Sequence, residues 1–247
     1  RVFKPASYKP WSAKQPPDLI GLYRPTKRGI EDLVKAGRIQ DIQSDVSRGW
    51  YAAFWPGMLE TFNIRSGGRT GVYGVPLTGQ VHLFVYNKTL FRKAGIAGPP
   101  RTWSELMSAA QKLVKIGVTP YAGGFGSDKP PLAAAYEWSY LGLHGLAETY
   151  FGRHSYTSHD WIRYLSLYPE MRRYGFTDTT WASMSGVGAI KALLDGRVGM
   201  VFTDAGFESI RASYKPAFTE WGGFGAPVDN RAPFLPRLPG GVVEGLA

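Results

Sequence analysis

The stretch that decides the fold is residues 85–106, which read VYNKTLFRKAGIAGPPRTWSEL. Asn87 follows an apolar strand and can cap a short helix over 88–94, which a glycine ends. Two prolines then break the chain. Thr102 and Glu105 have the spacing of a capping box, in which the threonine oxygen accepts from a free backbone N–H while the glutamate reaches back. The stretch therefore predicts a strand followed by two capped helices.

The alternation of strands and helices continues on both sides of this stretch. Short apolar runs predict strands, and apolar residues at helical spacing predict helices. Strands are predicted at 18–22, 70–76, 81–86, 118–122 and 198–203, and helices at 29–36, 102–116, 132–146, 190–194 and 206–214. Strands that alternate with helices define an α/β architecture.

The composition is that of a folded protein. The chain has 247 residues, of which 44% are hydrophobic and 19% charged. A disordered chain would combine low hydrophobicity with high charge. The length allows one large domain or two lobes. The absence of cysteine excludes disulfides, zinc–thiolate sites, iron–sulfur clusters and a cysteine nucleophile.

The net charge of +10 is spread along the chain rather than gathered in a basic run. A solvated basic surface is the favoured interpretation, and an anionic ligand, an anionic membrane surface or nucleic acid stay open as alternatives. No apolar run is long enough to cross a membrane, and the opening residues 1–5 do not form a signal peptide. We expect any targeting segment to lie outside this sequence.

Motifs of catalysis are missing from the sequence. The four histidines show no metal-ligand spacing, and neither a nucleophile elbow nor a phosphate-binding loop occurs. We therefore predict no catalytic residue, no metal ligand and no cofactor. A pair of converging carboxylates, as glycoside hydrolysis requires, is not ruled out by the sequence.

Three stretches together resemble one known family. The first combines YGVP at 73–76 with residues 85–106, and the second is ALLDGRVGM at 192–200. The third and weaker stretch is PDLI at 17–20 with residues 33–42. In this order they resemble the extracellular solute-binding proteins of ABC importers, of the carbohydrate type that includes maltose-binding protein.

The resemblance implies a two-lobed α/β clamp of the periplasmic-binding-protein type, with a hinge and apparently truncated at both ends. Residues 1–78 and 228–247 would form an incomplete lobe one, and residues 79–227 would form lobe two. A sugar or oligosaccharide would be trapped between the lobes by hinge closure and passed to the permease subunits of the importer. No catalysis and no nucleic acid are expected. The protein would be a periplasmic or extracellular, membrane-associated monomer.

Ligand-binding candidates are nominated by their place after strands or at crossings between the expected lobes, since open α/β sheets bind ligands beyond the carboxyl ends of their strands. Phe207 is expected to stack on a sugar, because the family often carries an aromatic ring near there; the alternative is that it begins a helix packed on the core of lobe two. Gly240 and Gly241 resemble a family turn beside the ligand. The candidates are Tyr23, Arg24, Gln80, His82, Phe125, Ser127, Asp128, Asp204, Phe207, Gly240 and Gly241.

Two alternatives to sugar binding stay open at this point. An anionic or phosphorylated ligand is favoured by the net charge of +10 and by Arg24. A glycan-processing enzyme is less favoured, because it would need two facing carboxyls and the nominated loops supply only Asp128 and Asp204, both from one lobe.

Overall fold

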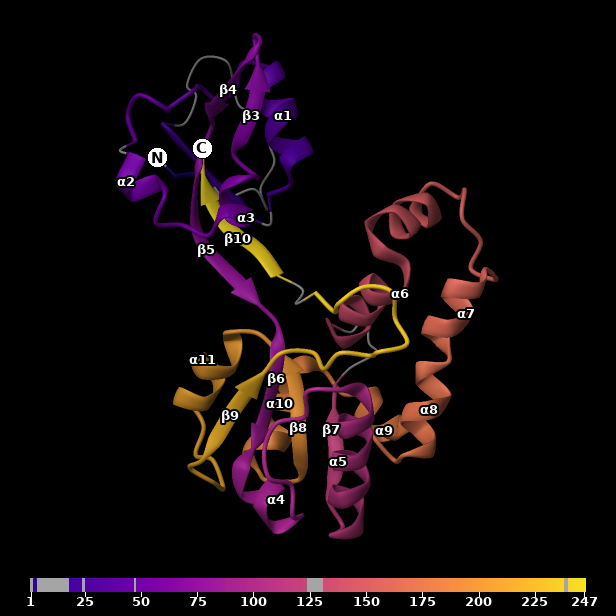
Figure 1. Cartoon of the computed structure of the whole chain (residues 1–247). Coiled ribbons are helices and arrows are strands. Elements are labelled where there is room, and N and C mark those ends of the chain that lie inside the picture. The colour runs from indigo at the N-terminus through magenta and orange to yellow at the C-terminus, as the bar shows by residue number, and fades with distance from the viewer. Residues whose placement is uncertain (1, 4–17, 24, 47, 124–130, 238–239) are drawn as a thin grey trace. The chain divides into compact units, whose positions relative to one another are not determined.

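The computed structural model describes residues 2–3, 18–23, 25–46, 48–123, 131–237 and 240–247 (Figure 1). The chain folds as two compact units. Unit 1 consists of Arg1–Gln80 and Gly240–Ala247, and unit 2 consists of Val81–Pro239. The chain therefore passes between the units twice, once on each side of unit 2.

Unit 1 is built on a four-stranded sheet with the strand order β1-β2-β10-β5. Strands β1 and β2 run parallel, whereas β10 runs antiparallel to β2 and pairs Glu244 with Tyr23. The strands are β1 (Val2–Phe3), β2 (Leu19–Tyr23), β5 (Val75–Val81) and β10 (Gly240–Leu246).

Among the described residues of unit 1, a hairpin and three helices accompany this sheet. Thr26 caps the first helix by accepting from the backbone N–H of Gly29 at 3.1 Å. Ile30 of that helix packs with Phe62 and Ile64 in a small buried cluster. These elements are α1 (Lys27–Lys35), α2 (Arg48–Tyr51), α3 (Pro56–Leu59), β3 (Asn63–Ser66) and β4 (Arg69–Val72).

Unit 2 contains a second four-stranded sheet with the order β7-β8-β6-β9. Strands β7 and β8 are parallel, and β6 runs antiparallel to both β8 and β9. The strands are β6 (Leu83–Asn87), β7 (Thr119–Ala122), β8 (Val198–Thr203) and β9 (Trp221–Phe224).

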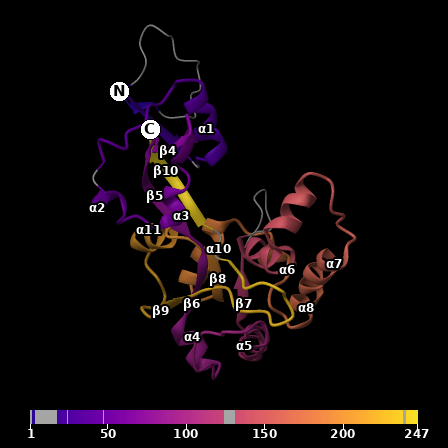
Figure 2. The same cartoon turned by 45° about the horizontal axis from the view of Figure 1, so that its top comes forward.

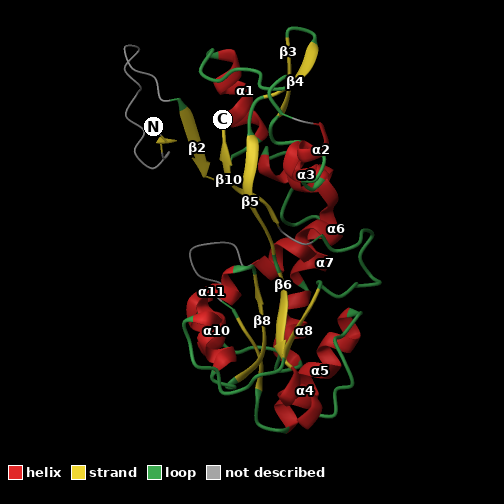
Figure 3. Ribbon diagram, turned by 90° about the vertical axis from the view of Figure 1, so that its left-hand side faces the viewer, coloured by secondary structure: helices red, strands yellow, loops and turns green. Residues whose placement is uncertain are grey.

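Helices cover both faces of this sheet. Figure 3 shows α10 and α11 on one face and α4 and α5 on the other, and Figure 2 shows α6, α7 and α8 together beyond the β7 edge. The helices are α4 (Lys88–Lys93), α5 (Trp103–Lys115), α6 (Pro131–Tyr150), α7 (His159–Leu165), α8 (Leu167–Arg173), α9 (Thr179–Ala182), α10 (Gly186–Leu194) and α11 (Gly206–Ala212). Among the described residues, no helix is long and apolar enough to cross a membrane.

The two sheet faces carry separate hydrophobic cores, as the alternation of side chains along a strand requires. Phe84 faces its cross-strand partner Phe202 in one core, and Val85 faces Val201 in the other. Leu193 and Val198 are fully buried in the second core. Every residue of β8 is buried, so this strand lies at the centre of the unit.

The two predicted caps are confirmed. The Asn87 side chain accepts from the backbone N–H of Leu90 at 3.0 Å, and the Thr102–Glu105 capping box has both of its hydrogen bonds. The helix predicted at 132–146 is present but has a break at Gly142, whose φ of 61° and ψ of −178° are not helical. The ring of Phe234 lies where a Cβ of residue 142 would be, which accounts for the glycine there.

The second boundary between the lobes was predicted wrongly. Residues 228–239 were expected in lobe one, but the structure places them in unit 2 and returns the chain to unit 1 at Gly240. Val228 pairs its backbone with Arg101 and Trp103, and the backbone N–H of Phe234 donates to the Ser139 carbonyl. These contacts extend unit 2 by twelve residues beyond the predicted boundary.

Candidate functional site

One edge of the unit 2 sheet gathers several of the nominated residues. The carboxyl ends of the parallel strands β7 and β8 share this edge. Because β6 is antiparallel to β8 and pairs Leu83 with Thr203, the start of β6 lies there too. His82 precedes β6 and Asp204 follows β8, so residues far apart in the sequence meet where the chain first enters unit 2.

His82 and Asp204 face each other across this edge. The His82 Nε2 atom lies 3.6 Å from Asp204 Oδ2, and the two side chains are 16% and 29% exposed. The His82 ring is roughly parallel to that of Phe202, with 6.2 Å between ring centroids. The second carboxylate oxygen of Asp204 accepts from the backbone N–H of Gly206 at 2.8 Å. The start of α11 thus holds the carboxylate in place while one oxygen faces the histidine.

Phe207 is not available for stacking on a ligand, which corrects the expectation from sequence. It lies in the first turn of α11, is 2% exposed and belongs to the core shared with Leu193 and Val201. Its ring meets Trp221 edge-on at a centroid distance of 5.1 Å. The helix predicted at 206–214 is present as α11, and its first turn places the Phe207 ring in the core.

In unit 1, the nominated residues lie at the edge where the connections join. Tyr23 ends β2, is 61% exposed and pairs with Glu244 of β10. Gln80 lies in β5 and is the last residue of unit 1 before the chain crosses. Gly240 and Gly241 open β10 and therefore stand in a strand, not in the expected turn.

Four nominated residues lie outside the described part of the chain, namely Arg24, Phe125, Ser127 and Asp128. The position of Asp128 relative to Asp204 is therefore not described.

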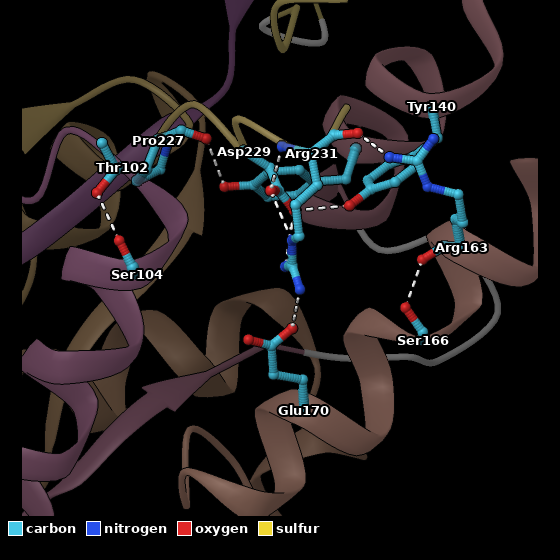
Figure 4. A network of polar contacts seen from close by, with 10 residues as sticks. Thr102, Ser104, Tyr140, Arg163, Ser166, Glu170, Pro227, Asp229 and Arg231 are labelled. Carbon is cyan, nitrogen blue, oxygen red and sulfur yellow. Dashed lines mark hydrogen bonds and ion pairs between the residues drawn. The ribbon is translucent and has the colours of Figure 1, made fainter. Parts of the chain in front are cut away.

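A polar network that sequence reasoning missed holds the segment 227–234 onto unit 2 (Figure 4). The Tyr140 hydroxyl donates to Asp229 Oδ2 at 2.7 Å, and the Tyr136 hydroxyl donates to the Pro227 carbonyl at 2.8 Å. The Arg231 guanidinium pairs with Asp229 at 2.8 Å and with Glu170 of α8 at 2.9 Å. The network ties the return segment to α6 and α8 shortly before the second crossing.

Electrostatics within this network favour the charged forms. Burial would raise the pKa of the Asp229 carboxyl, but donation from Arg231, Tyr140 and a backbone N–H outweighs it and lowers the pKa. Hydrogen bonding to Asp229 holds the pKa of Arg231 above its usual range, against the opposing effect of burial. The spacing Asp-x-Arg after a proline was the available sequence signal, but its partners lie about 60–90 residues earlier.

A serine, a histidine and an aspartate meet at the start of α7 without forming a catalytic triad. His154 Nε2 lies 2.9 Å from Asp160 Oδ2 and 3.0 Å from Ser158 Oγ. In a triad the serine and the carboxylate contact opposite ring nitrogens. Here both contact the same nitrogen, and Asp160 also accepts from the backbone N–H of Trp161. The cluster is a polar network at a helix start. Within the described ranges, no three potential metal ligands converge.

The chain forms two α/β units linked by two connections, and each unit carries nominated residues at an edge of its own sheet. The chain matches the bacterial extracellular solute-binding protein family over residues 12–247 and belongs to that family.

Individual relatives share less than a third of their aligned residues with the chain. A putative binding protein of Brucella abortus is 27% identical over 179 residues, which is 71% of this chain and 42% of the relative. The sn-glycerol-3-phosphate-binding periplasmic protein of Agrobacterium fabrum is 29% identical over 107 residues, or 41% of this chain and 23% of the relative.

Solved structures share the fold. A protein connected with xylan utilization by Caldanaerobius polysaccharolyticus superposes with a TM-score of 0.69 at 22% identity, covering 93% of this chain and 58% of the other. A maltose-bound protein of T. maritima gives a TM-score of 0.67 at 18% identity, covering 93% and 56%. The chain thus spans less than half the length of the first relative and little more than half of these structures.

Proposed function

We propose that this protein is the substrate-binding component of an ABC importer and captures a sugar or oligosaccharide between its two units. The ligand is held without chemical change and passed to the permease subunits. The protein acts as a monomer on the outer side of the membrane, in the periplasm or the extracellular space.

The observation that carries the proposal is the place of the candidate residues in each unit. Tyr23 and Gln80 lie at the edge of the unit 1 sheet where the connections leave, and His82 and Asp204 lie at the edge of the unit 2 sheet where the chain arrives. A ligand held at the joined edges would contact both units and would favour a closed arrangement.

The chemistry of these residues suits a hydroxylated ligand. The exposed Tyr23 ring offers an apolar face to C–H groups and a phenol at its rim. Gln80 provides an amide that both donates and accepts, and the Asp204 carboxylate accepts hydrogen bonds from hydroxyls. Maltose is bound in one of the structures of the same fold, and raffinose in another, which supports a sugar as the ligand class.

Calorimetric titration tests the ligand class. The probes are maltose, raffinose, a xylo-oligosaccharide, a chitin oligosaccharide and sn-glycerol 3-phosphate. We expect saturable binding of at least one neutral sugar. Binding of glycerol phosphate alone would replace the sugar proposal with the anionic alternative, and heat from none of the probes would contradict both.

A single variant tests the site. Asp204→Asn keeps the oxygen that accepts from Gly206 but removes the charge that faces His82. We expect the dissociation constant of the bound sugar to rise about tenfold or more, which corresponds to about 1.4 kcal/mol. Glu208→Gln, at an exposed residue of α11, the helix that follows Asp204, is the matched control and should bind like the unmodified protein. Equal affinities in the two variants would exclude Asp204 from the site.

A further inference from the structure

A pocket in unit 1 is lined by residues other than those nominated above. It has a volume of about 400 Å³ and is lined by residues of the segments 43–46 and 48–51 and of the β3–β4 hairpin. Its polar lining comes from Gln43, Arg48, Tyr51, Asn63 and Thr70. The volume falls within the range of about 300–1,000 Å³ that small-molecule sites occupy.

The hairpin presents its polar face to this pocket. Ile64 is buried with Ile30 of α1, so its neighbours Asn63 and Arg65 lie on the opposite face of the strand. Arg65 stands directly across from Thr70, which lines the pocket. The guanidinium of Arg65 thus flanks the same face as the lining side chains.

The polar groups of the pocket can donate hydrogen bonds to a ligand. The Tyr51 hydroxyl donates to Asn63 Oδ1 at 2.9 Å, so the amide nitrogen of Asn63 is the group that it can offer to a ligand. Arg48 forms no ion pair within the part of the chain that the structure describes. Gln43 adds a further amide at the rim.

The Asp41 carboxylate at the pocket wall is already paired. Asp41 Oδ1 accepts from the backbone N–H groups of Gln43 and Val72, and Oδ2 pairs with Arg69 at 3.0 Å. A Cβ added at Gly71, which lines the pocket, would lie 2.4 Å from Asp41 Oδ2. The charge of Asp41 is therefore offset by Arg69 and by two backbone N–H groups, whereas Arg48 adds a positive charge to the lining.

We propose that this pocket binds a small anion with several oxygens, such as a phosphate or a carboxylate, with Arg48 as the principal ligand. A guanidinium makes paired hydrogen bonds to two oxygens of such an anion, and its charge persists at every pH of interest. Asn63 and Thr70 donate to the remaining oxygens. The site shares no residue with the sugar site proposed above, so the two proposals are tested separately.

Titration with inorganic phosphate and with succinate, at ionic strength held constant with chloride, tests the proposal. We expect saturable binding of at least one of the two anions, and the comparison shows whether phosphate or carboxylate is preferred. Arg48→Gln should weaken that binding at least tenfold. Arg28→Gln is the matched control, since Arg28 is an exposed residue of α1, which packs on the other hairpin face. It should change the affinity less than twofold.

A second variant tests whether a loss of anion binding could be due to misfolding. Asn63→Asp keeps the oxygen that accepts from Tyr51 while placing a negative charge in the pocket. It should abolish anion binding and leave the far-ultraviolet circular dichroism unchanged. Absence of heat with both anions, or equal affinities in Arg48→Gln and Arg28→Gln, would overturn the proposal, whether or not a sugar binds elsewhere.

Discussion

The two units of this chain differ in how much of their structure is held by a hydrophobic core. Unit 2 surrounds its sheet with two hydrophobic cores that contain many fully buried aromatic and aliphatic side chains. In unit 1 the described residues form one small buried cluster, Ile30, Phe62 and Ile64, beside a sheet held by backbone pairing. Since burial of apolar area is the main favourable term in folding, we expect unit 2 to be much the more stable unit.

The exposed fractions of four tryptophan side chains show the same difference between the units. Trp50 is 50% exposed and Trp55 is 65% exposed, while Trp103 and Trp161 of unit 2 are 3% and 6% exposed. The same residue type is therefore a core component in one unit and a surface feature in the other. Substitutions matched between the units turn this contrast into measurable differences.

The largest effect is expected for Phe207→Ala in unit 2. Removing a ring that is 2% exposed and packed on Trp221 should lower the free energy of unfolding by about 3–5 kcal/mol. Denaturant unfolding followed by circular dichroism measures the loss, and Phe207→Leu serves as the conservative control. Protein that remains folded should keep its ligand affinity. A loss below about 1 kcal/mol would show that the ring is not a core residue.

The next effect concerns the buried carboxylate of Asp229. Asp229→Asn should cost about 1.5–3 kcal/mol, because charged hydrogen bonds to Arg231 and Tyr140 are lost. The pKa of Asp229 is lower in the folded state than in the unfolded state. The carboxylate therefore stabilises the fold fully at pH values above its unfolded-state pKa, and this stabilisation is lost as the pH falls through its folded-state pKa.

The pH dependence of unfolding checks this sign. The stability difference between the unmodified protein and Asp229→Asn should be full at neutral pH and shrink in acid below about pH 4, the ordinary range of an aspartate. Glu208→Gln, on the surface of α11, is the control for removal of an acidic group. A difference that grows as the pH is lowered would contradict the assignment.

A smaller effect separates the units directly through two equivalent helix caps. Thr102→Ala removes the capping box of α5, and Thr26→Ala removes the cap of α1. Either change should cost about 0.5–2 kcal/mol of helix stability. In unit 2 the cost should appear in the unfolding of the whole unit, and in unit 1 as faster amide exchange confined to α1. Exchange that spreads through all of unit 1 would mean that this unit is more cooperative than its core indicates.

The smallest effect is expected at Trp55. Because this side chain is 65% exposed, Trp55→Ala should change the free energy of unfolding by no more than about 0.5 kcal/mol. The measurement is the same denaturant titration as for Phe207→Ala. A loss as large as that of Phe207→Ala would remove the contrast between the units.

Local structure was predictable from sequence where it depends on neighbouring residues. The caps at Asn87 and Thr102 were identified because each side chain bonds a backbone group three residues away. The ligand role expected for Phe207 was wrong although its helix was predicted, since whether the ring faces a ligand or the core depends on long-range contacts such as that with Trp221.

Long-range contacts were not predictable in this way. The segment 228–239 has no periodicity, and its place in unit 2 depends on contacts such as Asp229 with Tyr140, 89 residues apart. The pairing of His82 with Asp204 required the register of β6 against β8, which the sequence alone does not define. The candidate site was therefore located by strand ends, and its geometry required the fold.

The strand order of unit 1 has a consequence for the synthesis of the protein. Strand β10 lies between β2 and β5, yet it is translated after all of unit 2. On the ribosome, residues 81–239 can fold as a continuous unit while the sheet of unit 1 still lacks the strand that joins its two halves. The strands made before unit 2 thus belong to a sheet that is completed after it, and until then the edges of β2 and β5 are open to pairing with other chains.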